Sequence, residues 1–228
     1  NKKGEGSDTY VIVPLNYMNY VIGYLAVKNY PEILYDLSIF RAINHIDALL
    51  MTLRQYIFSQ RTNRELKKIY MTDYLSGMYN RTGCDDVLFP YIENGKKAGD
   101  SLLLMFVDIN DMKTINDEHG HLNGDMAIKI AAEAMRAALP DKFLCGRYGG
   151  DEFIAVGPCD KEPSEYVQKI KDELKKIIKG IKITFKLSVG IGYRKISPDD
   201  TGTVDDYIKA ADEAMYEDKK AEKEKERG

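Results

Sequence analysis

The sequence lacks tryptophan, long hydrophobic runs and any recognisable export signal. Among its 228 residues the longest uninterrupted apolar run is 102–107, far short of the roughly 20 residues that a membrane-spanning helix needs. The first residues, Asn-Lys-Lys-Gly, do not have the pattern of a signal peptide. We therefore expect no membrane span in this chain.

The sequence also lacks a charge excess of either sign and a paired set of cysteines. Lys and Arg total 33 against 36 Asp and Glu, a formal net charge of -3, so no global basic field draws the chain to a nucleic acid polymer or to anionic lipid. The cysteines Cys84, Cys145 and Cys159 are odd in number and lack zinc-site spacing. Buried thiols in a reducing compartment, the cytoplasm, are the expectation.

What is present suffices for a globular core. Apolar residues make up 44% and charged residues 30% of the chain, a composition that argues against disorder and fibrous repeats. The length allows one full domain and a smaller attachment.

The attachment begins with a predicted β-hairpin. Residues 10–35 hold six of the sixteen tyrosines, and 10–15 and 20–27 have strand composition around a turn at 16–19. A two-stranded ribbon is marginal on its own, so it must pack on something or be the remnant of a larger sheet. The pattern resembles the final third of a GAF sensor domain, so we assign residues 1–35 to a possible sensor remnant.

A long helix is expected over 36–70, where Gly and Pro are absent. Such a helix would reach roughly 52 Å and suits a connecting rod. Two interpretations stay open: a coiled-coil seam that pairs two chains, or one helix that covers its own hairpin, because the repeat fades at Gln60 and Arg64. The seam would consist of apolar residues that alternate steps of four and three, namely Ile39, Ile43, Ile46, Leu50, Leu53 and Ile57.

Residues 71–228 form the second unit, for which the pattern predicts an α/β fold with a central hairpin. Strands are expected at 102–109, 143–147, 152–156 and 183–191, and helices at 81–97, 125–139, 162–179 and from 203 onward. Gly149-Gly150 lies between two short strands and predicts a type I′ turn, in which both central residues have positive φ.

Two acidic groups lie at strand ends. Asp108 ends the strand 102–109, and Asp151-Glu152 follow the two glycines. If these strands are neighbours, the carboxylates of Asp108 and Asp151 and a backbone carbonyl form an oxygen-rich pocket suited to Mg²⁺. Alternatively, the hairpin is a solvated acidic turn and Asp108 caps a short helix that begins near Asp111.

Residues 113–125 are dense in side chains that can read a base edge. Guanine presents N1–H and N2–H₂ side by side, and a carboxylate such as Asp125 can accept both while the Asn116 amide bonds another edge atom. Alternatively the segment is a loop in which Gly120 ends one helix, Asp125 caps the next, and His121 is structural.

Taken together, these blocks resemble the GGDEF family of diguanylate cyclases. The resemblance covers residues 71–219 in the family's order. It rests on Asp-Tyr-Leu-Ser-Gly-Met-Tyr-Asn-Arg at 73–81, the strand ending at Asp108, residues 116–125, Arg-Tyr-Gly-Gly-Asp-Glu-Phe at 147–153, Ser-Val-Gly-Ile-Gly at 188–192, and Ala-Asp-Glu-Ala-Met-Tyr-Glu-Asp-Lys at 211–219.

The resemblance implies a ferredoxin-like nucleotidyl-cyclase palm that condenses two GTP into cyclic di-GMP and pyrophosphate. It further implies Mg²⁺, with Mn²⁺ as an alternative, and a homodimer joined through the N-terminal helix, because each domain holds one GTP. By carry-over, the metal ligands are Asp108, the Ile109 carbonyl and Asp151, and Asp151 or Glu152 helps to deprotonate the attacking hydroxyl. The nucleotide would lie against Asn116, His121, Asp125, Gly149 and Gly150, with its triphosphate on Lys113, Lys219 and Lys223.

Three departures from the family pattern carry expectations of their own. Asn110 replaces a usual second Asp, which leaves the first ligand position intact. The charged tail at 222–227 replaces Gly-Arg-Asn, so the last helix is expected to run on without a final edge strand. Pro140 and Phe143 occupy the two ends of the family's Arg-x-x-Asp inhibitory site, so that site is expected to be missing.

Two other functions compete with the active cyclase. A catalytically silent module that binds GTP or cyclic di-GMP arises in this family when acidic or glycine positions are lost, and none of the essential ones is lost here. A cyclase with relaxed base choice is disfavoured by Asp125.

Overall fold

The computed structural model describes residues 8–17, 20–29 and 37–227. The chain divides into two compact units, Asn1–Lys67 and Lys68–Gly228, and each is described by itself. None of the helices within the described residues is long and apolar enough to cross a membrane.

The first unit contains the predicted hairpin. Strands β1 (Tyr10–Tyr17) and β2 (Tyr20–Lys28) pair antiparallel with a register shift between Leu15 and Asn16. The ion pair between Lys28 Nζ and Asp8 Oδ2 (2.6 Å) lies beside its open end. The hairpin prediction is confirmed, and part of the predicted turn, residues 18–19, lies outside the described residues.

The long helix is also present, as α1 (Leu37–Met71). The predicted seam residues Ile46, Leu53 and Ile57 have 41%, 54% and 44% of their surface exposed, so the hairpin of the same chain leaves this face uncovered. Leu50 is half-buried, and the side chains of Ile39 and Ile43 lie outside the described residues.

The second unit has the βαββαβ order of a ferredoxin-like fold. Its sheet runs β4-β5-β3-β6 with every pair antiparallel, so the first palm strand, β3, lies inside the sheet between the last two. The predicted fold class is confirmed. The repeat consists of β3 (Leu102–Ile109), α4 (Met112–His119), α5 (His121–Ala138), β4 (Leu144–Arg147), β5 (Glu152–Pro158), α6 (Pro163–Gly180) and β6 (Val189–Ile196).

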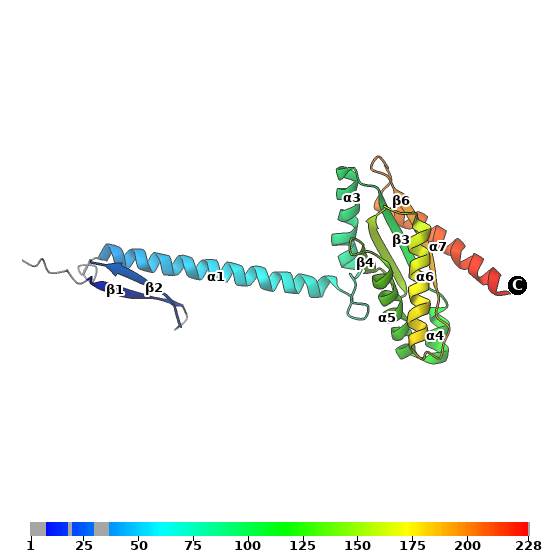
Figure 1. Ribbon diagram of the computed structural model, residues 1–228, viewed down its shortest axis with the longest axis horizontal. Coiled ribbons are helices and arrows are strands. Elements are labelled where there is room, and N and C mark those ends of the chain that lie inside the picture. The colour runs from blue at the N-terminus through cyan, green and yellow to red at the C-terminus, as the bar shows by residue number, and fades with distance from the viewer. Residues whose placement is uncertain (1–7, 18–19, 30–36, 228) are drawn as a thin grey trace, which may run out of the picture. The chain divides into compact units, whose positions relative to one another are not determined.

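Helices cover both faces of this sheet (Figure 1). Before the repeat come α2 (Arg81–Gly83), a π-helical turn η2 (Cys84–Leu88) and α3 (Phe89–Ala98), and after it comes α7 (Val204–Arg227). Alternate side chains of β3 therefore enter two cores. Leu103, Met105 and Val107 pack with α5 and α6, whereas Leu102, Leu104 and Phe106 pack with α3 and α7.

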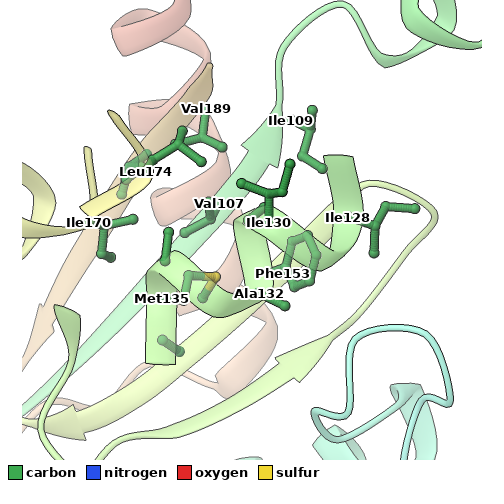
Figure 2. Close-up of a cluster of buried hydrophobic side chains, with 14 of the residues drawn as sticks. Val107, Ile109, Ile128, Ile130, Ala132, Met135, Phe153, Ile170, Leu174 and Val189 are labelled. Atoms are coloured by element: carbon green, nitrogen blue, oxygen red, sulfur yellow. The ribbon is translucent and has the colours of Figure 1, made fainter. Parts of the chain in front are cut away.

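Figure 2 shows the core on the α5 and α6 side, where Val107 of β3 and Phe153 of β5 meet Ile130 and Ile170. All four side chains are at most 4% exposed. This packing fixes the central strands, whose ends carry the acidic residues.

Two element predictions need correction. The strand predicted at 183–191 begins only at Val189, because its partner β3 ends opposite that residue at Ile109. Phe185 and Leu187 before it are buried against the core without a strand partner. The helix predicted at 81–97 is interrupted by the π-helical turn.

Candidate active site

The acidic residues predicted to share a metal lie at neighbouring strand ends. The Ile109 N–H donates to the Asp151 carbonyl at 3.2 Å, and Asp108 is paired in register with Glu152 of β5. The sheet order thus brings together two segments more than 40 positions apart in the chain. The alternative role for Asp108 is wrong, since the residue at the N-cap of α4 is Asp111.

The glycine pair at the hairpin tip has a different role from the one predicted. Neither Gly149 nor Gly150 is among the residues with positive φ, so the type I′ assignment is wrong. Instead the N–H groups of Tyr148 and Gly149 both donate to the Glu152 carbonyl. A Cβ at Gly149 would lie 2.1 Å from Glu152 Oε2, whereas one at Gly150 would meet nothing within 4 Å. Gly149 therefore allows the Glu152 carboxylate to approach the backbone closely, and the space beside the Gly150 Cα is open.

Arg147 holds this tip in place. Its Nε and Nη2 donate to the Gly150 carbonyl at 3.0 and 2.6 Å, and its Nη1 donates to Asp73 Oδ2 at 3.1 Å. Burial acts to raise the pKa of Asp73, but its hydrogen bonds with Ser76 and the Arg147 charge outweigh burial and lower that pKa. No role was predicted for Arg147 or Asp73, although an arginine two residues before a glycine pair could have suggested one.

Four carboxylates influence one another at the strand ends. The pKa of Asp108 is raised mainly by burial and further by the charges of Asp151 and Asp212, whereas Lys219 acts to lower it. The pKa of Glu152 is raised by burial and by Asp108, Asp151 and Asp212. Asp212 on α7 is a third residue without a predicted role. A site of this kind attracts cations.

A pocket of about 470 Å³ opens beside these acids, within the size range of small-molecule sites. It gathers six of the predicted residues, together with Arg147 and others. Its lining is Met112, Lys113, Asn116, Asp117, His121, Asp125, Ile128, Arg147, Gly150 and Asp151.

The helices α4 and α5 present the predicted base-reading groups to this pocket. Gly124 allows them to approach, because a Cβ there would lie 2.1 Å from Asn116 Oδ1. Gly120 ends α4 as predicted in the structural alternative, but Asp125 is not an N-cap, since α5 already begins at His121. The helix predicted to begin at 125 is therefore four residues longer at its start.

Lys219 of α7 reaches the strand ends, where its Nζ donates to Asp108 Oδ1 in an ion pair. Helix α7 continues to Arg227, as the charged tail predicted, and no strand follows β6 in the part of the chain that is described. The side chain of Lys223 lies outside the described residues.

The two positions of the family's inhibitory motif lie elsewhere, in a mainly apolar pocket of about 590 Å³. Pro140 is exposed and Phe143 is 7% exposed. The Phe143 ring lies 5.0 Å from that of Tyr166 and occupies the space that a Cβ at Gly157 would need. Neither side chain can form an ion pair with a phosphate or a base.

The donor set fits Mg²⁺ in part. No three His, Cys, Asp or Glu side chains among the described residues gather closely enough to hold a metal by themselves. Asp108, Asp151 and the Ile109 carbonyl supply hard oxygen ligands, and Mg²⁺ normally completes such a set with water and substrate phosphates. The Lys219 ammonium on Asp108 indicates that a cation is accommodated there.

Comparisons with known proteins show the family to which the chain belongs. Residues 70–225 match the family model "Diguanylate cyclase, GGDEF domain". The chain is 30% identical over 158 residues to the cyclic di-GMP phosphodiesterase NbdA of Pseudomonas aeruginosa, covering 68% of this chain and 20% of that protein. It is 30% identical over 156 residues to the diguanylate cyclase DgcP of the same organism, covering 66% and 23%.

The chain thus spans about a fifth to a quarter of the length of these curated relatives. Among solved structures, the diguanylate cyclase SiaD of Pseudomonas aeruginosa, in complex with its activator SiaC, has a TM-score of 0.66 at 22% identity, covering 83% of this chain and 74% of that one. At that identity the likeness concerns the fold alone. Because the family model matches more than half of this chain's residues, the chain belongs to the GGDEF family of diguanylate cyclases.

Proposed function

We propose that this chain is an active diguanylate cyclase that condenses two GTP into cyclic di-GMP and two pyrophosphates, with Mg²⁺ or Mn²⁺. The observation that carries the proposal is the pocket where Asn116 of α4, Asp125 of α5 and Asp151 of the turn between β4 and β5 converge. A catalytically silent binding module would not need acidic residues beside this pocket.

The pocket would hold the guanine nucleotide. Asp125 accepts the N1–H and N2–H₂ donors, Asn116 bonds a further edge atom, and His121 and Lys113 lie at the same pocket. The open space at Gly150 lets the nucleotide approach the backbone. Lys113, Lys219 and Lys223 would contact the triphosphate.

The reaction joins the 3′-oxygen of one nucleotide to the α-phosphorus of the other. Asp151 or Glu152 takes the hydroxyl proton, the bond between the α-phosphorus and the bridging oxygen breaks, and pyrophosphate leaves. A second, equivalent step closes the ring. A divalent cation held by Asp108, Asp151 and the Ile109 carbonyl would supply positive charge against the phosphate oxygens. The chain's own contribution is mainly alignment and electrostatics.

Because the second unit of each chain offers one such pocket, catalysis needs two chains that face each other. We propose that α1, whose seam residues are uncovered in the single chain, joins them as a homodimer. In this proposal residues 1–35 are a GAF-like sensor remnant, 36–70 a signalling helix and 71–228 the cyclase domain. The free thiols Cys84, Cys145 and Cys159 support a cytoplasmic location.

The test is to incubate the chain with GTP and Mg²⁺ at a concentration where light scattering finds dimers, and to separate the products by chromatography. We expect cyclic di-GMP and pyrophosphate, and no product from Asp151→Asn, which removes a ligand charge from a half-buried loop without removing core volume. Circular dichroism should find that variant folded. Dimeric wild-type chain that binds GTP but yields no product would establish the silent module.

A further inference from the structure

The side chain of Lys219 occupies the place where a cation is expected. Its ammonium forms an ion pair with Asp108, and the two side chains are only 21% and 16% exposed. A pair this well shielded is weakened less by solvent and salt than a surface pair. Lys219 therefore neutralises the first predicted metal ligand in the absence of a metal.

The fold provides a path for this lysine. Gly190 of β6 lies opposite Asp108 of β3 in the strand register. A Cβ at Gly190 would lie 2.4 Å from Cγ and 2.8 Å from Cε of Lys219. The aliphatic part of the Lys219 side chain thus passes over Gly190, which has no side chain, and its ammonium reaches the Asp108 carboxylate.

The charge around this contact explains why a counter-ion is needed. The negative charges of Asp151 and Asp212 act on Asp108, and those of all three residues act on Glu152. A single ammonium relieves part of this repulsion, but it also takes up an oxygen that a divalent cation would bind.

We propose that Lys219 is an internal counter-ion that exchanges partners during substrate binding. It leaves Asp108 when a divalent cation binds there, and its released ammonium then meets the triphosphate of the nucleotide. This inference rests on the proposed function, because it assumes the metal and nucleotide sites described above. Its consequence is that cation and nucleotide favour each other's binding, as linkage requires.

The first test measures Mn²⁺ binding to the full chain by electron paramagnetic resonance, without nucleotide. Lys219→Met keeps the stem over Gly190 but removes the charge, so we expect Mn²⁺ to bind about 10-fold more tightly, equivalent to about 1.4 kcal/mol. Lys219→Arg should bind Mn²⁺ like the wild type. Lys113→Met is the matched control, because it removes a charge from the neighbouring pocket without breaking the pair with Asp108, and it should change the affinity less than about 2-fold.

The second test follows Lys219 itself by reaction with an amine-specific reagent and mass spectrometry. Labelling should be slow in the metal-free chain, faster with Mg²⁺ alone, and slow again with Mg²⁺ and a non-hydrolysable GTP analogue. Equal Mn²⁺ affinity in wild type and Lys219→Met, with labelling that Mg²⁺ leaves unchanged, would overturn the exchange while the proposed cyclase stands. Failure of every variant to bind Mn²⁺, with or without the analogue, would overturn both.

Discussion

Arg147 is the residue on which the geometry of the hairpin tip most depends. It connects the Gly150 carbonyl to Asp73, a residue 74 positions earlier in the chain. Because Gly150 and Asp151 border the pocket, the Asp73–Arg147 ion pair positions the loop that carries a predicted metal ligand. Asp73 therefore acts through Arg147 and does not need to touch the substrate.

Asp73→Asn should lower the stability of the second unit in a pH-dependent way. The pKa of Asp73 in the folded chain lies below its ordinary value of 3.8, so its stabilisation is fully present above that value and is lost as the pH falls through the folded pKa. We expect a loss of roughly 1–3 kcal/mol in the free energy of unfolding at neutral pH, measured by urea titration. The difference from wild type should shrink as the pH falls below 3.8, the ordinary pKa, toward the lower pKa of the folded chain.

The exposed Asp199, whose carboxyl takes no part in the site, offers a matched control. Asp199→Asn should unfold like the wild type at both pH values. A constant difference between Asp73→Asn and wild type across the titration would contradict the role of the Asp73 charge.

Phe143 leads to a prediction about feedback. Its ring is committed to packing with Tyr166 and Gly157, and Pro140 offers no charge. Added cyclic di-GMP should therefore inhibit only by competition with GTP at the active site. Initial rates over a matrix of GTP and product concentrations should give an unchanged maximal rate, and a fall in that rate would indicate a second product site.

At this scale the sequence predicted residues that the fold gathers at one pocket, such as Asn116, Asp125 and Asp151, because they stand in motifs at strand and helix ends. Their roles in metal and nucleotide binding stay predictions. The sequence did not reveal Arg147, Asp73 or Asp212, since their roles depend on which residues the fold places opposite them. The prediction of positive φ at Gly149 and Gly150 was wrong for a related reason. A glycine is also required at position 149 because Glu152 approaches it closely, and this reason does not involve φ.

Among the elements, those with strong periodicity were predicted nearly complete, as with β3 and α6. The errors lie where a neighbour decides the outcome. Residues 183–187 have the alternation of a strand but no residue of β3 opposite them, because β3 ends opposite Val189 and Ser188 is bonded to Asn110 just beyond it. The start of α5 at His121 was missed because Asp125 looks like a cap.

The uncovered face of α1 supports a prediction at the element scale. Ile46→Glu with Leu50→Glu places two charges in the proposed seam, so light scattering should find monomers and the rate of cyclic di-GMP formation should fall at least about 10-fold. The control is Gln55→Glu with Ser59→Glu, which adds the same charges at the same spacing on the opposite helix face. If the seam variant remained dimeric, the proposed seam would be wrong.

For the whole molecule, the proposed half-sites on separate chains imply that activity depends on protein concentration. Over a roughly thousand-fold dilution, the specific activity should fall as dimers dissociate. Pyrophosphate release measures the rate, and light scattering at matched concentrations measures the dimer fraction, so the two curves should coincide. A specific activity that does not change while dimers dissociate would mean that one chain suffices.

The position of Asp73 also sets a limit on how this protein can be recombined with others. The sheet and its covering helices begin only at Arg81, but the segment before it contributes Met78 to the core and Asp73 to the ion pair with Arg147. A chimera spliced at Arg81 would therefore lose both. A foreign sensory module should therefore be joined ahead of Asp73.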